Sequence, residues 1–258
     1  MVLTPGGLRL TSSVLPVPDG GSINISENEI QLLDASKNIV HTSPVNKTKA
    51  GTVPEASGWI TYASWVTSGP PISYFNTFWT VPPAPVTYNG QTIYLFNSLL
   101  PANGEAILQP VLQYGPSAAG GGAYWTVANW YVTESTAYYS PLTTVNVGDI
   151  LEGIIEIYSW TGSAFSYVSL FVDIPGQIQL NNSAGLVWAT ETLESYGVTT
   201  GTDYPEGHTV FSSINLIETL PQPSGSWSVS ADDLDDGLYT TVVLNGATNA
   251  EVVITYPT

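Results

Sequence analysis

The chain has 258 residues, only 10% of them charged, and its formal net charge is −17 at pH 7. Cysteine is absent, which excludes disulfides and thiolate metal sites. The four cationic side chains all lie early in the chain, at Arg9, Lys37, Lys47 and Lys49. An acidic surface of this kind repels phosphates, so neither nucleic acids nor anionic membranes are expected as partners.

No apolar run approaches the roughly 18 residues of a transmembrane helix. Residues 1–10 lack the basic segment and long apolar stretch of a signal peptide. We therefore expect a cytoplasmic or non-classically secreted protein.

Residues 1–55 are predicted to form an N-terminal extension, followed by one domain over residues 56–258. Within the extension, partial alternation over Ser22–Val40 predicts two short strands around the polar turn Asp34–Asn38. Because this segment holds every Lys and Arg, it could dock on the acidic body as a prosegment or lid. The simpler alternative, which we favour from the sequence, is that it pairs with a sheet edge.

From Trp59 onward, short runs rich in β-branched and aromatic residues alternate with Gly- and Pro-rich turns. Strands are predicted at Trp59–Val66, Tyr74–Val81, Thr92–Phe96, Ala106–Tyr114, Tyr124–Thr133, Ile150–Tyr158, Phe165–Val172, Gln177–Leu180, Gly185–Thr192, Val210–Ile217, Trp227–Val229 and Glu251–Tyr256. This spacing, without a helical period, predicts an all-β fold. We expect a two-sheet antiparallel β-sandwich of the concanavalin A-like or jelly-roll type.

The inventory of catalytic side chains is narrow. Only two histidines are present, His41 and His208, and there is no Gly-x-Ser-x-Gly motif, so a serine triad or a histidine-based zinc site is not expected. The acidic cluster Asp232–Asp236 could bind calcium, but it lacks the spacing of a twelve-residue calcium loop. We therefore expect no metal and no cofactor, and carboxylates remain as the catalytic groups.

Two stretches place polar side chains in apolar company. In Gly104–Gly115, Gln109 and Gln113 lie in an apolar run, with Gln109 on the same strand face as Ile107 and Val111. A buried Gln is either a structural hydrogen-bonding group or a working donor.

In the second stretch, Leu186–Glu194, burial would raise the pKa of Glu191. Glu194, three residues later, would point to the opposite face and is the weaker candidate. A glycosidase-like pair of Glu191 with Glu134 or Glu105 is a further option.

Several short motifs in this order resemble the glutamic peptidases (eqolisins), acid-acting fungal and bacterial endopeptidases with a two-sheet sandwich. They are Phe78–Pro82, Ala106–Gln109, Tyr124–Tyr131, Val147–Asp149, Trp188–Glu191 and Val252–Tyr256, spread over about 200 residues.

The resemblance implies that Glu191 activates water and that Gln109 holds the tetrahedral oxyanion. It also implies a substrate-binding set: Gln113, Tyr94, Asn97, Trp188, Trp125 and Trp130. Two positions depart from the family pattern, since Tyr94 replaces a Trp and Gln113 replaces a supporting Asp.

The expected function is therefore that of an acid-acting hydrolase, most concretely a glutamic endopeptidase acting on polypeptides. One alternative is a leaderless carbohydrate-binding protein on the same sandwich, in which tyrosines near turns stack on sugars, at Tyr88, Tyr138, Tyr139 and Tyr204. A second alternative is a divergent enzyme that uses the Glu/Gln cleft on a small-molecule or other non-peptide substrate.

Overall fold

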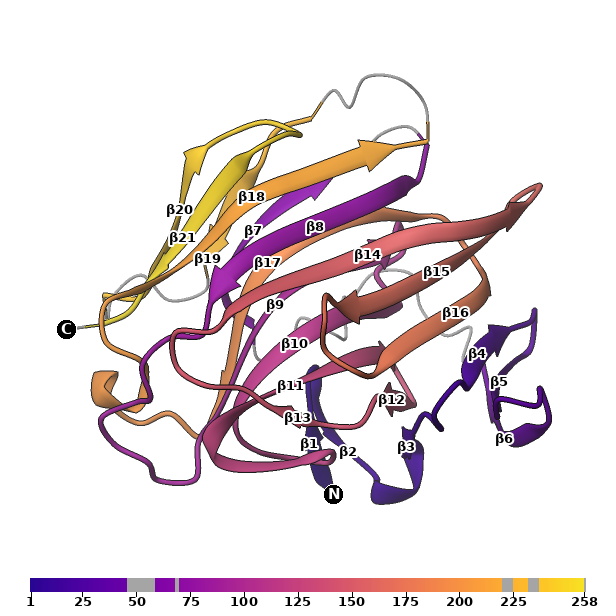
Figure 1. Ribbon diagram of the computed structural model, residues 1–258, viewed down its shortest axis with the longest axis horizontal. Coiled ribbons are helices and arrows are strands. Elements are labelled where there is room, and N and C mark those ends of the chain that lie inside the picture. Colours follow the sequence, from indigo (N-terminus) through magenta and orange to yellow (C-terminus); the bar gives the residue numbers. More distant parts are fainter. Residues whose placement is uncertain (46–58, 68–69, 220–224, 232–236, 258) are drawn as a thin grey trace.

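The computed structural model describes residues 1–45, 59–67, 70–219, 225–231 and 237–257. Two large sheets, one of nine strands and one of ten, pack face to face (Figure 1). This confirms the predicted all-β two-sheet sandwich. Short 3₁₀ turns, η1 (Thr11–Ser13) and η3 (Gly201–Asp203), interrupt the strands.

The nine-stranded sheet has the order β19-β7-β17-β9-β10-β11-β12-β3, with β13 beside β11. Its strands are β19 (Ser228–Ala231), β7 (Trp59–Val66), β17 (Leu186–Tyr196), β9 (Thr92–Pro101), β10 (Ala106–Ser117), β11 (Gly120–Thr133), β12 (Ala137–Tyr139), β13 (Thr143–Thr144) and β3 (Val14–Pro16).

The ten-stranded sheet has the order β20-β21-β18-β8-β14-β15-β16-β4-β5-β6. Its strands are β20 (Tyr239–Leu244), β21 (Ala250–Thr255), β18 (His208–Glu218), β8 (Ile72–Thr80), β14 (Ile150–Thr161), β15 (Ala164–Phe171), β16 (Gln177–Ser183), β4 (Ser22–Ile25), β5 (Glu29–Leu33) and β6 (Ile39–Pro44).

Residues 1–45 extend both sheets. Strand β3 pairs with β12, and β4 pairs with β16, and both of these pairings are parallel. The other pairings in the described ladders are antiparallel, so the sandwich is antiparallel apart from these two junctions with the N-terminal segment. The remaining N-terminal strands, β1 (Val2–Thr4) and β2 (Gly7–Arg9), form a separate two-stranded hairpin.

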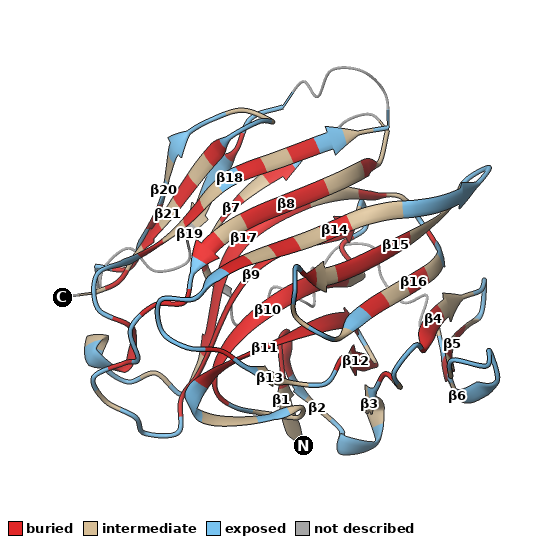
Figure 2. Cartoon of the chain, in the orientation of Figure 1, coloured by how far each residue is buried: buried red, intermediate tan, exposed pale blue. Residues whose placement is uncertain are grey.

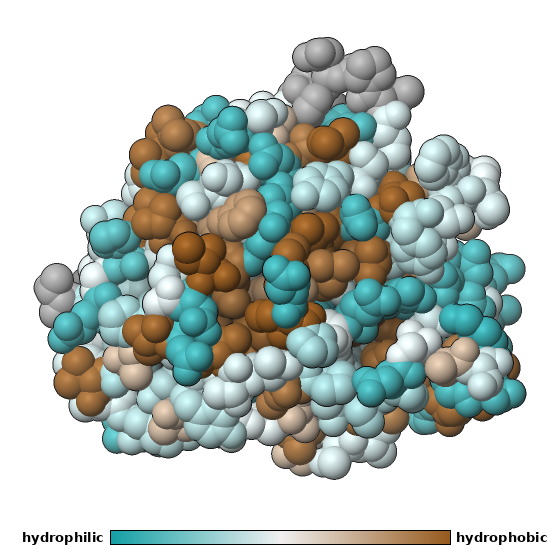
Figure 3. Space-filling model, in the orientation of Figure 1, coloured by the Kyte–Doolittle hydropathy of each residue, from teal (hydrophilic) through white to brown (hydrophobic). Residues whose placement is uncertain are grey.

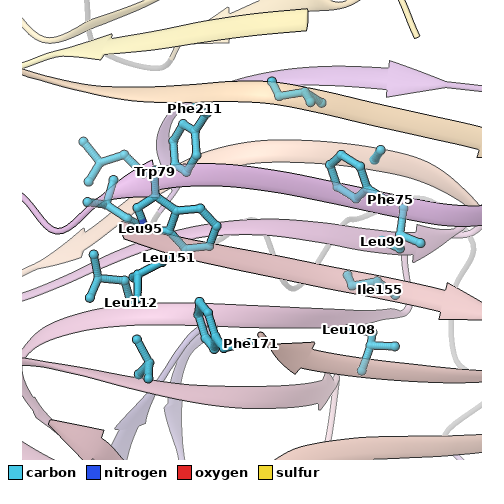
Figure 4. Packing of buried hydrophobic residues seen from close by; sticks show 14 of the residues in the cluster. Phe75, Trp79, Leu95, Leu99, Leu108, Leu112, Leu151, Ile155, Phe171 and Phe211 are labelled. Atoms are coloured by element: carbon cyan, nitrogen blue, oxygen red, sulfur yellow. The ribbon is translucent and has the colours of Figure 1, made fainter. Parts of the chain in front are cut away.

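The main core fills the space between the two sheets. Four leucines of the nine-stranded sheet face a layer of large side chains from the other sheet (Figure 4); they are Leu95 and Leu99 of β9 and Leu108 and Leu112 of β10, opposite Phe75, Trp79, Leu151, Ile155 and Phe171. Because successive side chains of a strand alternate between faces, this layer fixes which residues of β9 and β10 look away from the core.

A second apolar cluster lies on the other side of the nine-stranded sheet, which we call the outer face. It contains Tyr94, Phe96, Leu100, Ile107, Val111, Ala128, Trp130, Val132 and Ala137. Strands β9 and β10 are consequently buried along almost their whole length (Figure 2). By contrast, β14 of the ten-stranded sheet alternates between buried and more exposed residues from Ile150 to Ile155, and β8 mixes buried with partly exposed residues without strict alternation. On their open side apolar and polar side chains are interspersed (Figure 3).

Candidate functional site

The two glutamines of β10 lie on the outer face. Leu108 and Leu112 belong to the core between the sheets, whereas Ile107 and Val111 belong to the outer-face cluster. Gln109 shares the face of Ile107 and Val111, as the sequence predicts, and is paired across the ladder with Trp130 of β11.

Glu191 points the other way. Its neighbours two residues before and after, Ala189 and Leu193, are part of the core between the sheets. The Glu191 side chain is fully buried, and Thr77 of β8, in the opposite sheet, donates its hydroxyl to Glu191 Oε1 at 2.5 Å. Burial raises the pKa of Glu191 well above its usual value, against the smaller lowering by the Thr77 hydrogen bond.

The structure therefore does not bring Gln109 and Glu191 together, because they stand on opposite faces of one sheet. The six residues expected to bind substrate divide in the same way. Gln113, Tyr94, Trp188 and Trp130 belong to the outer face, while Asn97 and Trp125 point into the core. Asn97 lies directly across from Glu191 and donates to the Gly153 carbonyl at 3.2 Å.

On the outer face, Gln109 is a buried amide without a partner. It is 1% exposed, and neither Gln109 Nε2 nor Gln109 Oε1 makes a hydrogen bond within the described part of the chain. Such groups are rare in folded proteins, since an unpaired buried amide costs about 1–3 kcal/mol. Among the described residues, Gln109 therefore has no structural hydrogen-bonding partner.

Gln113 has a structural role instead. Gln113 Nε2 donates to the carbonyls of Gly115 at 2.7 Å and Gly120 at 3.0 Å, which fixes the bent end of the β10–β11 hairpin. A Cβ at Gly121 would come within 2.4 Å of Gln113 Nε2, and Gly121 has a φ of 99°. Glycine is therefore required at this close approach.

Glu194 is the carboxyl group of the outer face. It lies across from Tyr94, which in turn pairs with Gln113. Glu194 Oε1 accepts hydrogen bonds from the Gly6 backbone at 2.6 Å and from the Tyr196 hydroxyl at 2.5 Å, while Glu194 Oε2 has no partner in the described chain.

Burial raises the pKa of Glu194 to about 8, despite the opposing effects of the Tyr196 and Gly6 hydrogen bonds and of the Arg9 charge. The sequence predicted the opposite-face position of Glu194 from its spacing of three, but ranked it below Glu191.

Hydroxyl groups occupy the sheet surface between Gln109 and Glu194. The register places Ser98 beside Gln109 and across from Thr190. The Ser98 and Thr190 hydroxyls are 2.6 Å apart, and those of Thr190 and Thr192 are 2.8 Å apart. Hydroxyls, rather than a carboxylate, therefore stand next to Gln109.

The outer face is covered by the N-terminal hairpin (β1 and β2), which lies near β10 in Figure 1. Its turn, residues Thr4 to Gly7, is buried against the sheet. Besides the Gly6–Glu194 bond, Ala118 donates its backbone N–H to the Leu3 carbonyl at 2.7 Å, and Arg9 donates to the Thr133 carbonyl at 3.1 Å.

The other sites considered in the sequence are not assembled on this face. Glu105 and Glu134 line a separate cavity that Glu191 does not reach, so they form no glycosidase-like pair with it. No group of three His, Asp or Glu side chains suited to a metal occurs among the described residues, and Asp232–Asp236 lies outside them. None of the described helices is long and apolar enough to cross a membrane.

The tyrosines of the carbohydrate alternative are mostly covered. Tyr138 is fully buried and Tyr204 is 4% exposed, stacked on Tyr256, while Tyr139 is half-buried. Tyr88 alone of the four is exposed, at 42%. The expected set of exposed aromatics is therefore corrected, because the sandwich uses three of them for packing.

No protein-family model matches the chain, and no curated protein matches its sequence. Among solved structures, scytalido-glutamic peptidase bound to a transition-state-analogue inhibitor is similar, with a TM-score of 0.51, 13% identity, 77% of this chain covered and 98% of that chain. SCP-B, an eqolisin peptidase in complex with the tripeptide Ala-Ile-His, has a TM-score of 0.48 and 12% identity over the same shares. At this identity the likeness to scytalido-glutamic peptidase extends to the β-sandwich fold alone.

Proposed function

We propose that the outer face of the nine-stranded sheet binds an extended or turn-forming polypeptide. The observation that carries the proposal is Gln109, whose two amide atoms are buried without partners. A primary amide offers donors and an acceptor, which match the alternating C=O and N–H groups of a peptide backbone. A ligand that supplies them would remove the cost of leaving both groups unpaired.

The charge of the chain favours a cationic polypeptide. The net charge is −17, and no Lys or Arg follows Lys49. A negative surface raises the rate at which positively charged partners associate and repels anionic ones. The fold is consistent with a peptide ligand, since scytalido-glutamic peptidase is a peptidase with a similar sandwich.

Peptide hydrolysis is a second candidate function, and Glu194 is the observation that favours it. A carboxyl group whose pKa is raised to about 8 keeps its proton at neutral pH and can donate it to a leaving amine. Glu191 has no access to the same face, because its carboxyl group lies between the two sheets against Thr77. The proposed acid–base residue of such a reaction is therefore Glu194: it protonates the amine as the C–N bond breaks, and the water that adds its oxygen to the acyl carbon returns a proton to the carboxylate.

The test measures the binding of reduced, carboxamidomethylated lysozyme, a cationic unfolded polypeptide, to the wild-type chain. It is repeated with the Gly6→Pro variant, which removes the backbone N–H that Glu194 accepts under the hairpin. We expect binding, and we expect Gln109→Leu to weaken it at least tenfold. Gln177→Leu makes the same change at an exposed position of β16 and should leave binding unchanged. Equal binding by Gln109→Leu and Gln177→Leu would refute the proposal.

Cleavage of the same probe, followed by mass spectrometry from pH 3 to 8, decides between binding and hydrolysis. If the protein is a hydrolase, Glu194→Gln should abolish cleavage and Glu191→Gln should preserve it. The reverse result would return the reaction to Glu191 and contradict the face assignment. Binding without any cleavage would identify a polypeptide-binding protein.

A further inference from the structure

The N-terminal hairpin lies where a polypeptide ligand of the proposed function would lie. Its turn is buried over the outer face, and the Gly6 backbone N–H donates to Glu194 Oε1 at 2.6 Å. This is the kind of contact that the backbone of a bound peptide would make with the same carboxyl group. Gly6 and Gly7 have φ values of 89° and 100°, so glycine is required for the turn to enter.

The hairpin is held on the sheet by its buried turn and by hydrogen bonds that include Gly6–Glu194, Ala118–Leu3 and Arg9–Thr133, and not by strand pairing. It is a separate two-stranded sheet with three residue pairs, and it does not join the ladders of the nine-stranded sheet. Two-stranded hairpins of this size are marginally stable by themselves. A solvent-open groove of about 420 Å³ lies beside it, lined by Val2, Leu3 and Leu8 of the hairpin and by Thr92, Pro116 and Tyr196 of the body.

The docked hairpin also leaves polar groups unpaired. Gln109 has no partner for either amide atom, and Glu194 Oε2 and Arg9 Nε are likewise without partners in the described residues. A segment selected only to seal the sheet would be expected to satisfy these groups or to replace them with apolar ones. The docked hairpin therefore occupies the face without satisfying the polar groups that a ligand could bind.

A turn follows the hairpin in the chain. Residues Thr11–Ser13 form the 3₁₀ turn η1, which buries none of its side chains. Beyond it, β3 is anchored in the parallel ladder with β12, and Val17 donates to the Tyr139 carbonyl at 2.8 Å. The turn η1 thus separates the hairpin from the anchored part of the N-terminal segment.

We infer that residues 1–10 are an intramolecular occupant of the polypeptide-binding face, which an incoming polypeptide must displace. The inference rests on the proposed function and adds its regulation. A tethered segment has an effective concentration on the order of millimolar, so it competes strongly with a ligand present at micromolar concentration. Opening the hairpin should therefore increase the affinity for a polypeptide added in trans.

The experiment uses the full chain with a fluorescent, end-blocked peptide of the sequence of residues 1–10. Gly6→Pro removes the N–H that Glu194 accepts and cannot adopt a φ of 89°. Arg9→Ala, a second opening variant, removes the bonds to the Gly6 and Thr133 carbonyls. Gly162→Pro places the same strain in the β14–β15 turn, where nothing lies within 4 Å of the site of a Cβ.

Fluorescence anisotropy should show the peptide binding to Gly6→Pro and Arg9→Ala at least tenfold more tightly than to wild type or Gly162→Pro. Hydrogen exchange should show reduced protection of residues 1–10 in the two opening variants. Equal affinity in all four chains would overturn the occupant role while leaving polypeptide binding intact. Absence of binding by every chain, for this peptide and for unfolded lysozyme, would overturn the proposed function itself.

Discussion

Replacing Gln109 by leucine should stabilise the protein. Gln109 is 1% exposed, lies on the face of Ile107 and Val111, and has both amide atoms without partners among the described residues. Leucine is of similar size and has no polar atoms, so it can join this apolar cluster. A buried amide without a partner costs about 1–3 kcal/mol, and the free energy of unfolding should rise by about this amount.

The matched control is Gln113→Leu, the same substitution on the same strand and face. Here Gln113 Nε2 donates to the Gly115 and Gly120 carbonyls, so leucine would leave both acceptors unpaired. The free energy of unfolding should fall by about 1–3 kcal/mol. Urea unfolding at equilibrium, followed by tryptophan fluorescence, measures both changes from the midpoint, provided that the slope is unchanged.

The signs of the two changes in unfolding free energy decide whether Gln109 is a structural group. If Gln109→Leu destabilises the chain as Gln113→Leu does, then the Gln109 amide has partners in the folded protein and is a structural group. The reason for assigning a ligand to the outer face would then be lost. A stabilised Gln109→Leu that binds polypeptide less well would instead show a residue retained at a cost in stability.

Three further predictions concern residues between the sheets and in the loops. Burial raises the folded-state pKa of Glu191 well above the value of 4.5 that applies to the unfolded chain, so its contribution to stability is complete in acid and declines as the pH rises toward the folded pKa. Glu191→Gln should therefore make the free energy of unfolding fall less steeply as the pH rises above about 4.5, by at most about 1.4 kcal/mol per pH unit, in urea titrations; an unchanged slope would mean that folding does not raise the pKa of Glu191. Asp203 should stabilise the protein at neutral pH and lose this contribution in acid, because the Thr87 hydroxyl, and then the hydrogen bonds from Thr199 and Thr200, lower its pKa. Asp203→Asn should therefore lower the urea midpoint at pH 7. The difference between this midpoint and that of wild type should shrink by pH 2.5. Gly153→Ala should destabilise the chain by about 1–3 kcal/mol, since a Cβ would lie 2.5 Å from Asn97 Oδ1 and 2.8 Å from Pro110 Cγ. Gly162→Ala adds the same group in open space and should cost only the strain of alanine at a φ of 62°, about 1 kcal/mol, so thermal unfolding should place Gly153→Ala below Gly162→Ala.

The fold class followed from the sequence because strands leave local signals. Every predicted strand segment from Trp59 onward overlaps a strand of the structure, and Trp59–Val66 is reproduced at both ends. The strand Tyr239–Leu244 is missing from the predicted set, although Tyr-Thr-Thr-Val-Val-Leu is a continuous run rich in β-forming residues. The predicted ends of strands are wrong where pairing extends a strand beyond its local signal. Strand β9, predicted to end at Phe96, continues to Pro101.

The N-terminal segment was harder to place. The sequence left a docked lid and a strand at a sheet edge as alternatives for this segment, without indicating which residues would do either. Strands β3 and β4 extend the two sheet edges, while the hairpin of β1 and β2 covers the outer face. Short strands such as Val2–Thr4 carry too few residues for an alternation signal, and their position depends on partners more than 100 residues away.

The candidate site failed to assemble as expected for a reason that strand geometry explains. Trp188 and Glu191 are three residues apart, so a continuous strand must place them on opposite faces. The prediction from the sequence used this spacing for Glu191 and Glu194 but not for Trp188. Trp188 lies on the outer face with Gln109. No local pattern could predict the pairing of Glu191 with Asn97 or of Leu108 with Leu99. These two pairings determine which side chains of β17, β9 and β10 share a face of the sheet.

The register of β17 therefore determines which carboxyl group can meet a ligand. Ala189 and Leu193 are both fully buried in the core, so a slip by one residue would expel them and admit Thr190, Thr192 and Glu194. The core thus holds Glu191 inside, where a protonated carboxyl group bonded to Thr77 is tolerated, and it holds Glu194 outside, under the hairpin. Glu191 and Glu194 are three residues apart, so one of them lies on each face of the sheet whichever register β17 adopts. The packing of Ala189 and Leu193 in the core therefore selects which of the two carboxyl groups lies on the outer face, where a ligand can reach it.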